Sequence, residues 1–126
     1  MTISAAIAAV AELKPHAYDA ERLISWLHEL DTLLYAKLKE ESVVDWLPET
    51  WAGYDADTGR ETELLAPVPY DIPLYTHWLC AKVSLYNREM PHYQNETVLF
   101  NEAWGALGRY MTRAYPSVVK TTHFRL

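Results

Sequence analysis

Prolines and one long irregular stretch divide this chain into four segments, each short enough to be a single helix. Pro15, Pro91 and Pro116 interrupt apolar patterns of helical period, because the residue before a proline avoids helical backbone angles. Between residues 42 and 70, prolines and glycines recur and no helical period is present. The pattern therefore predicts an all-α chain, with two helices before the irregular stretch and two after it.

Polar capping residues predict where the first two helices begin. Thr2 precedes an alanine-rich segment with an apolar stripe of helical spacing, and this first helix should end before Pro15. Asp19 precedes a second stripe, which is rich in leucine. We expect the second helix to run for roughly 22 residues and to reach about Glu41, a length of about 33 Å.

The last two helices follow the irregular stretch. Asp71 is expected to cap the third, and the fourth should begin near His92 and end at Pro116. Gly105 and Gly108 weaken the fourth helix by about 1 kcal/mol each relative to alanine. A neighbouring helix approaching closely at these glycines would compensate for that loss.

The segment between the second and third helices is too long for an ordinary connection, and such segments are commonly functional. A turn at residues 57–59 (Asp-Thr-Gly) favours a small β-hairpin between Trp51–Tyr54 and Thr62–Leu65. The 126-residue length predicts one domain. We therefore expect a helical domain over residues 1–115, with residues 42–70 as a loop insertion, and an extended C-terminal tail over 116–126.

Charge is unevenly distributed along the chain. Residues 39–63 carry eight acidic and two basic side chains, whereas residues 109–126 carry four basic side chains and no acidic one. Separation of this kind indicates an interaction surface. The total formal charge of −6 argues against a dedicated nucleic-acid-binding protein, and the longest apolar runs are too short to span a membrane.

The motifs that resemble chemical sites are incomplete. Glu89 and His92 have the spacing of a di-iron helix motif, but only one copy is present and Pro91 lies within it. Residues 55–61 alternate oxygen ligands as a calcium loop does, yet the twelfth position is alanine. Cys80 lies among apolar residues, as a buried packing residue would. We therefore predict no catalytic, cofactor-binding or metal-binding residues.

The candidates for contacts with partners are aromatic residues of the loop and charged residues of the acidic segment (39–63) and the basic segment (109–126). Exposed rings often anchor interfaces. The predicted interface residues are Trp51, Tyr54, Asp55, Asp57, Glu61, Glu63, Arg109, Arg113, Lys120, Phe124 and Arg125.

Several stretches carry a resemblance to a known family. The densest is residues 63–75 (ELLAPVPYDIPLY), which is followed by LYNRE at 85–89, YQNE at 93–96 and YMTR at 110–113. A looser match covers 12–18 (ELKPHAY) and 25–31 (SWLHELD). In these stretches the chain resembles the small head–tail connector, or adaptor, proteins of tailed phages and of prophages in Gram-positive bacteria. Residues 42–62 and 118–126 follow no pattern that can be placed in this family.

The resemblance implies an α-helical connector-type fold, a structural role in the virion at the head–tail junction, and synthesis in the bacterial host cytoplasm. Such proteins form a ring, usually of twelve subunits, beneath the portal protein. The ring extends the DNA channel without sequence-specific DNA binding, and it docks a downstream head-completion (stopper) or tail protein. The implied partners are thus copies of the chain itself, the portal and that downstream protein.

The residues agree with such a role, because ring assembly needs two different complementary surfaces on each subunit. We expect the acidic segment of one copy to face a basic segment of a neighbour or ring partner. An acidic channel lining that repels DNA is a rival use of the same charges. A small cytoplasmic regulatory or binding module of a prophage is the alternative function, and a small helical enzyme of unknown type is a third.

Overall fold

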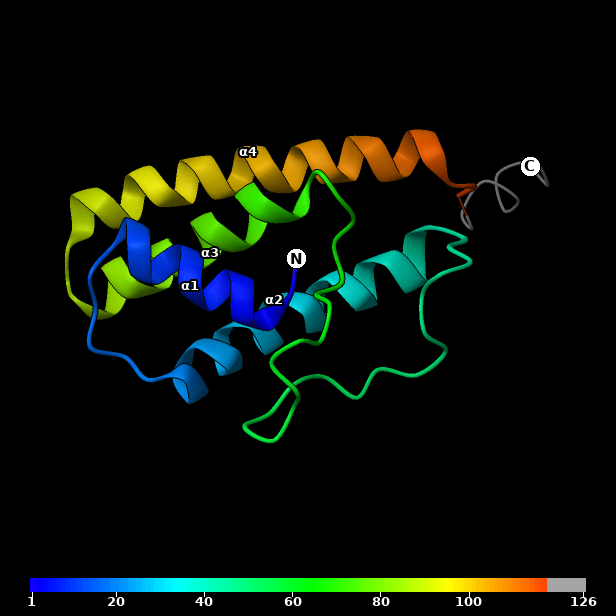
Figure 1. Cartoon of the computed structure of the whole chain (residues 1–126). Helices are drawn as coiled ribbons and strands as arrows, with labels where there is room; N and C mark the ends of the chain where they lie inside the picture. Colours follow the sequence, from blue (N-terminus) through cyan, green and yellow to red (C-terminus); the bar gives the residue numbers. More distant parts are fainter. Residues whose placement is uncertain (118–126) are drawn as a thin grey trace.

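The structure is a computed structural model that describes residues 1–117, and its regular elements are four helices. In chain order they are α1 (Ile3–Leu13), α2 (Ala20–Glu41), α3 (Asp71–Tyr86) and α4 (Met90–Ala114), shown in Figure 1. The described residues form only two isolated β-bridges and no strand. The all-α prediction is therefore confirmed.

The first two helices begin and end where their sequence predicts. The Thr2 hydroxyl accepts a hydrogen bond from the backbone N–H of Ala5 at 3.0 Å, which caps α1. The Asp19 carboxylate accepts one from the N–H of Arg22 at 2.9 Å, which caps α2. These bonds satisfy backbone donors that have no partner within the helix.

The starts of the last two helices differ slightly from the prediction. Tyr70 occupies the cap position of α3, and Asp71 is the first helical residue. Its carboxylate binds the α-amino group of Met1 at 2.7 Å instead of capping the helix. α4 begins at Met90, two residues before His92, because Pro91 is tolerated in a first helical turn.

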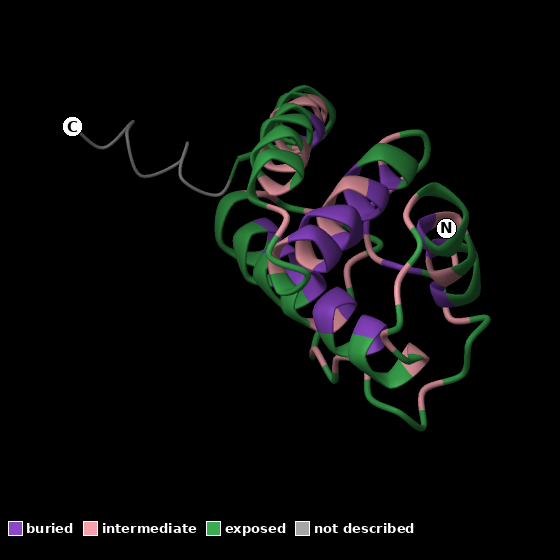
Figure 2. Cartoon of the chain, turned by 90° about the vertical axis from the view of Figure 1, so that its left-hand side faces the viewer, coloured by how far each residue is buried: buried purple, intermediate pink, exposed green. Residues whose placement is uncertain are grey.

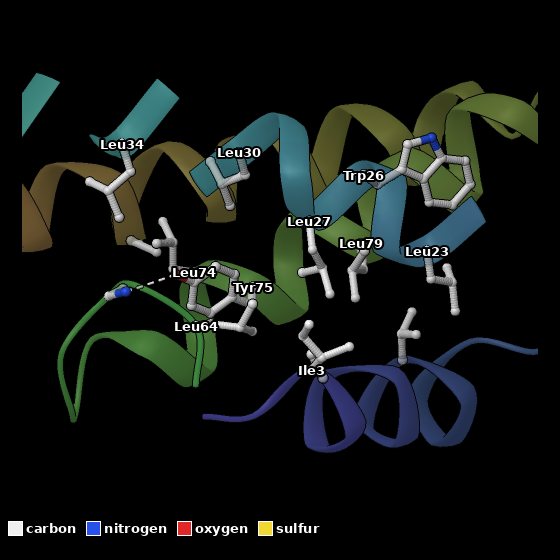
Figure 3. Packing of buried hydrophobic residues seen from close by; sticks show 14 of the residues in the cluster. Ile3, Leu23, Trp26, Leu27, Leu30, Leu34, Leu64, Leu74, Tyr75 and Leu79 are labelled. Atoms are coloured by element: carbon white, nitrogen blue, oxygen red, sulfur yellow. Dashed lines mark hydrogen bonds between the residues drawn. The ribbon is translucent and has the colours of Figure 1, made fainter. Parts of the chain in front are cut away.

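The hydrophobic core lies where α1, α2 and α3 meet. Ile3 of α1, Leu27 and Leu30 of α2, and Leu74 and Leu79 of α3 are buried and point toward one another (Figure 3). The leucine stripe of α2 thus serves as the central face of the core. Removing such apolar surface from water is the main stabilising contribution to a fold of this kind.

α4 is attached mainly through one neighbour. It lies along α3, and no Cα atom of α4 comes within 8 Å of one in α1 or α2. Over its 25 residues, a length of about 37 Å, only Ala103, Leu107 and Met111 are buried. Figure 2 shows α4 exposed over most of its surface.

Aromatic rings tie the C-terminal end of α4 to the 42–70 loop. Tyr110 stacks on Tyr70 with ring centroids 4.8 Å apart. The indole N–H of Trp46 donates to the hydroxyl of Tyr115 at 2.6 Å, and the two rings meet edge to face. The C-terminal end of α4 is thus held by loop side chains in addition to its buried residues Leu107 and Met111.

The predicted hairpin in the 42–70 loop is wrong. The backbone groups that would have paired bind other partners: Thr62 C=O accepts from Ile3 N–H at 3.1 Å, and Leu64 N–H donates to Met1 C=O at 2.8 Å. The N–H of Tyr54 donates to the ring of His28. The start of the chain therefore takes the place that a second hairpin strand would occupy.

Candidate interaction surface

An open groove lies between the C-terminal halves of α2 and α4, and we refer to it as the α2–α4 groove. Its volume is about 730 Å³. The buried side chains that line it are Leu34 and Leu38 of α2 and Leu107 and Met111 of α4. Since apolar surface in a concave site favours the binding of apolar groups, this groove is a candidate docking site.

Gly105 and Gly108 both line the α2–α4 groove. A Cβ atom built on Gly108 would meet nothing within 4 Å, and one on Gly105 would meet only the Arg109 guanidinium at 3.3 Å. The expectation that a neighbouring helix packs closely at these glycines is therefore wrong. The space beside them belongs to the groove, because α2 and α4 do not approach each other.

Replacing Gly108 with alanine should stabilise the chain by about 1 kcal/mol, because alanine restricts the unfolded backbone and fits the open space without a clash. Urea denaturation monitored by circular dichroism measures the change. Gly105→Ala is the matched comparison, and it should gain less because the Arg109 side chain has to move aside. Equal or lower stability for Gly108→Ala would contradict an open groove at this position.

The rim of the α2–α4 groove on the α4 side is basic. Arg109 and Arg113 line it and are exposed, and neither takes part in an ion pair among residues 1–117. On the α2 side Lys37 and Glu41 form an ion pair of 2.7 Å, one helical turn apart. The two arginines are thus the cations that this face offers to a partner.

The middle of the 42–70 loop, residues 50–61, lies on the opposite side of α2 from α4, and we refer to it as the acidic loop (Figure 1). The side chains of Asp55, Asp57, Glu61 and Glu63 are all exposed. Asp55 holds its own turn together, since its carboxylate accepts the N–H of Asp57 at 2.9 Å. Glu63 binds the α-amino group of Met1 at 3.1 Å.

Trp51 and Tyr54 hold the loop against α2. The Trp51 ring stacks on Tyr35 with centroids 5.3 Å apart, and its indole N–H donates to the Thr32 hydroxyl at 2.9 Å. Tyr54 packs edge to face on Trp51 and donates its hydroxyl to Asp31. Both rings are half-buried, so a role in partner contacts stays a prediction. Lys120, Phe124 and Arg125 lie outside the described residues.

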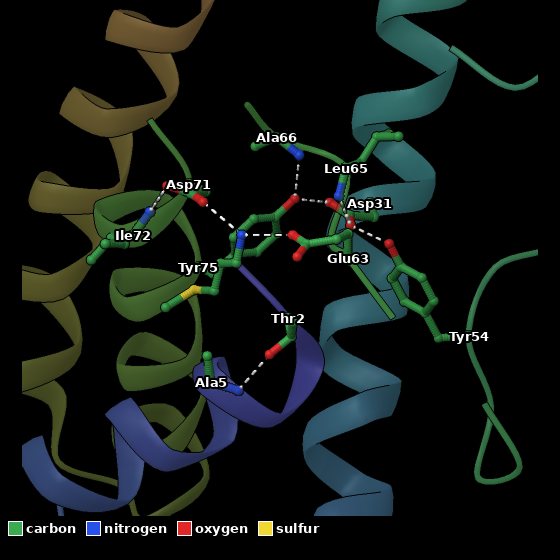
Figure 4. Close-up of polar contacts among 11 residues, drawn as sticks. Thr2, Ala5, Asp31, Tyr54, Glu63, Leu65, Ala66, Asp71, Ile72 and Tyr75 are labelled. Carbon is green, nitrogen blue, oxygen red and sulfur yellow. Dashed lines mark hydrogen bonds and ion pairs between the residues drawn. The ribbon is translucent and has the colours of Figure 1, made fainter. Parts of the chain in front are cut away.

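A buried carboxylate that the sequence analysis did not single out joins the loop to two helices. Asp31 of α2 accepts hydrogen bonds from the hydroxyls of Tyr54 and Tyr75, each at 2.6 Å, and from Leu65 N–H at 3.0 Å (Figure 4). The Tyr75 hydroxyl in turn accepts from Ala66 N–H at 2.8 Å. Asp31 is 0% exposed, so these donors have its carboxylate and not water as their acceptor.

Burial sets the ionisation of this network. It raises the pKa of Asp31, although the hydrogen bonds from Tyr54, Tyr75 and Leu65 act in the opposite direction. Burial, together with the nearby Asp31 carboxylate, raises the pKa of Tyr54 and that of Tyr75, so both hydroxyls remain donors. The sequence did hold a signal for Asp31, because it lies on the leucine stripe of α2 between Leu27 and Leu34.

The residues of the incomplete motifs have other partners. Glu89 binds the ammonium group of Lys14 at 2.6 Å, which lowers the pKa of Glu89. Cys80 is buried in the core. Within residues 1–117 no three histidine, cysteine or acidic side chains converge as metal ligands do, and no helix of this part is long and apolar enough to cross a membrane.

The candidate surface therefore consists of three parts: the acidic loop on one side of α2, the apolar α2–α4 groove on the other side, and the two arginines on the rim of that groove. Comparison with protein-family models, with curated proteins and with solved structures finds no match to this chain.

Proposed function

We propose that this chain is a structural protein of the phage virion, a head–tail connector that forms a ring beneath the portal, extends the DNA channel and docks the next connector or tail protein. The observation that carries the proposal is the separation of the exposed loop acids from the basic residues of α4. The part of the loop that holds Asp55, Asp57 and Glu61 lies on the opposite side of α2 from α4, the helix that carries Arg109 and Arg113. One subunit therefore presents two complementary surfaces.

Two unlike surfaces on opposite sides of a subunit are what a ring requires. A head-to-tail contact repeats around a ring when each copy offers one surface to the copy before it and the other to the copy after it. In this arrangement the acidic loop of one copy faces the basic rim of α4 in the next. Attraction between exposed charges mainly sets the orientation and rate of association, and the apolar groove adds surface that association can bury.

The overall charge supports the channel part of the proposal. A formal net charge of −6 disfavours lasting contact with the DNA phosphates, so DNA can pass a ring of such subunits without adhering. The four-helix architecture agrees with the fold that the resemblance implies. The portal partner and the virion location come from the resemblance alone.

Reversing Arg109, Arg113, Lys120 and Arg125 to glutamate should abolish ring assembly on the purified portal protein, or weaken it at least tenfold. The reason is that the rim would then repel the acidic loop of the neighbouring copy. Analytical ultracentrifugation of chain and portal mixtures measures the assembly. A rise in salt should weaken the wild-type assembly in the same direction. Assembly that is indifferent to salt and to the reversal would refute the electrostatic contact.

A matched control reverses two exposed arginines elsewhere. The double reversal Arg109→Glu with Arg113→Glu should also weaken assembly, and Arg22→Glu with Arg88→Glu changes the net charge by the same amount on surfaces away from the groove. We expect the control pair to assemble like the wild type.

Binding of the wild-type chain to the purified portal protein distinguishes the connector role from the alternative function. A chain that is monomeric by itself still agrees with a connector, since the portal can act as the template for the ring. A chain that does not bind portal refutes the connector role. That result would favour the small cytoplasmic binding module of a prophage, for which the α2–α4 groove would be the binding site.

A further inference from the structure

The α2–α4 groove opens at the point where the described part of the chain ends. Ser117, the last described residue, lines its mouth together with Tyr115. We propose that residues 118–126 of the same chain bind in this groove. This inference goes beyond the connector role, because it concerns the isolated subunit.

The direction of the chain at Ser117 supports this occupant. Ser117 forms an antiparallel bridge with Ser42, and Val43 N–H donates to Pro116 C=O at 2.8 Å. In an antiparallel pair the two segments run in opposite directions, so the chain that continues after Ser117 heads toward Glu41, the residue before Ser42. Glu41 is the last residue of α2 and lines the groove, so the bridge directs the following residues toward the groove.

The segment is long enough to follow the groove. From Tyr115 back to Trp104, the α4 side of the groove extends about 17 Å at 1.5 Å per residue. An extended chain advances about 3.3 Å per residue, so five or six residues after Ser117 cover this distance. A segment of nine residues is therefore long enough to span the groove.

The chemistry of the segment matches the groove. Val118, Val119 and Phe124 are apolar, as is the floor formed by the leucines of α2 and by Leu107 and Met111. A Cβ atom built on Gly108 would meet nothing within 4 Å, so the groove is open on its α4 side even when residue 108 carries a side chain of that size. Lys120 follows the mouth of the groove by three residues, within reach of the carboxylates that end α2 at Glu40 and Glu41.

Covalent attachment favours the chain's own segment over a second copy. A segment tethered at the mouth of its site has an effective concentration in the millimolar range, which exceeds the usual concentration of free chains. Occupation by the attached segment is therefore favoured in the unassembled subunit.

A pair of cysteines tests the proposal in the full chain without the portal. Gly108 lies seven residues before Tyr115 along α4, about 10 Å, and position 121 lies about 13 Å beyond Ser117 in an extended chain. Gly108→Cys combined with Thr121→Cys should therefore form an intramolecular disulfide at pH 8. A non-reducing gel and the intact mass, lower by two hydrogens, measure its yield.

Controls keep the experiment specific. Native Cys80 can remain, because burial raises the pKa of its thiol to about 11 and only 4% of the residue is exposed. Ala114→Cys with Thr121→Cys is the matched control, since Ala114 is exposed, does not line the groove and lies closer than Gly108 to Ser117 along the chain, so a tethered segment that does not bind the groove would reach it at least as easily. We expect the Gly108 pair to form at least tenfold more intramolecular disulfide than this control.

Two outcomes would overturn the proposal. Equal yields from both pairs would show that residues 118–126 do not bind in the groove. Disulfide-linked dimers of the Gly108 pair would show that a second copy's segment occupies it. Thr112→Cys with Thr121→Cys repeats the test at another lining residue and keeps it decisive if the Gly108 variant fails to fold. Failure of portal binding would leave this result unaffected.

Discussion

Replacing Asp31 with alanine is expected to lower the free energy of unfolding by about 3 kcal/mol. The substitution leaves three donors without their acceptor, namely the buried hydroxyl of Tyr75 and the half-buried hydroxyl of Tyr54 and N–H of Leu65. Each unsatisfied buried donor costs about 1–3 kcal/mol, and the removal of a buried charge offsets part of the sum. Urea denaturation followed by tryptophan fluorescence measures the loss.

Asparagine at position 31 is the matched control, because it has nearly the same shape and keeps one acceptor oxygen. We expect Asp31→Asn to lose less stability than Asp31→Ala at pH 7. Tyr75→Phe removes a single hydroxyl from the network and should cost about 1–2 kcal/mol. An alanine variant as stable as the wild type would show that Asp31 does not hold the loop in place.

The stability difference between wild type and Asp31→Asn should also depend on pH. Because the pKa of Asp31 is raised in the folded state, the folded chain binds the proton more tightly than the unfolded chain does. The contribution from protonation is fully present below the unfolded pKa, near 3.8, and is lost as the pH rises through the raised folded value. Wild type should therefore gain stability relative to Asp31→Asn as the pH falls from 7 toward 4. A change in the opposite direction would contradict the raised pKa.

Gly53→Ala should destabilise the chain by about 2 kcal/mol and release part of the loop. Gly53 has a φ of +74°, which disfavours any side chain. An added Cβ would also collide with the imidazole of His28, and this ring accepts the N–H of Tyr54. The backbone strain and the displacement of the ring add to each other. Chemical denaturation and the rate of limited proteolysis within residues 42–70 measure the two effects.

Gly59→Ala provides the control in the same loop. A Cβ at this position would meet only the Thr62 hydroxyl at an ordinary 3.7 Å, so little change is expected. Gly53→Ala should cost less in a His28→Ala background than in the wild type, because the collision is absent there and only the part that comes from φ remains. If Gly53→Ala and Gly59→Ala behave alike, the contact with His28 has no effect on stability.

The helices could be predicted because their signals are local. Thr2 and Asp19 cap the helices they were expected to cap, and the proline positions delimit the helical segments well. Asp71 shows the limit of this reasoning. Its capping propensity does indicate the start of a helix. Its carboxylate, however, binds the α-amino group of Met1, which is far away in sequence. No local pattern reports such a partner.

The conformation of the loop could not be predicted, because side chains from other elements hold it in place. A hairpin between residues 51–54 and 62–65 agrees with the local turn signal, yet the backbone at Thr62 and Leu64 pairs with the start of the chain. The partners of Asp31 lie 23 and 44 residues away along the chain. The α2–α4 groove was missed for a related reason, since glycines in a helix predict close packing and open space equally well.

The contacts at the C-terminal end of α4 attach this helix a second time, separately from its packing along α3. Along its length α4 is carried by α3, and at its far end Trp46 and Tyr115, with Tyr70 and Tyr110, fasten it to the loop. These attachments consist of the Trp46–Tyr115 and Val43–Pro116 hydrogen bonds, the bridge between Ser42 and Ser117, and the ring contacts. They lie outside the contacts among α1, α2 and α3, so we expect them, and not the contacts among those three helices, to set the width of the groove.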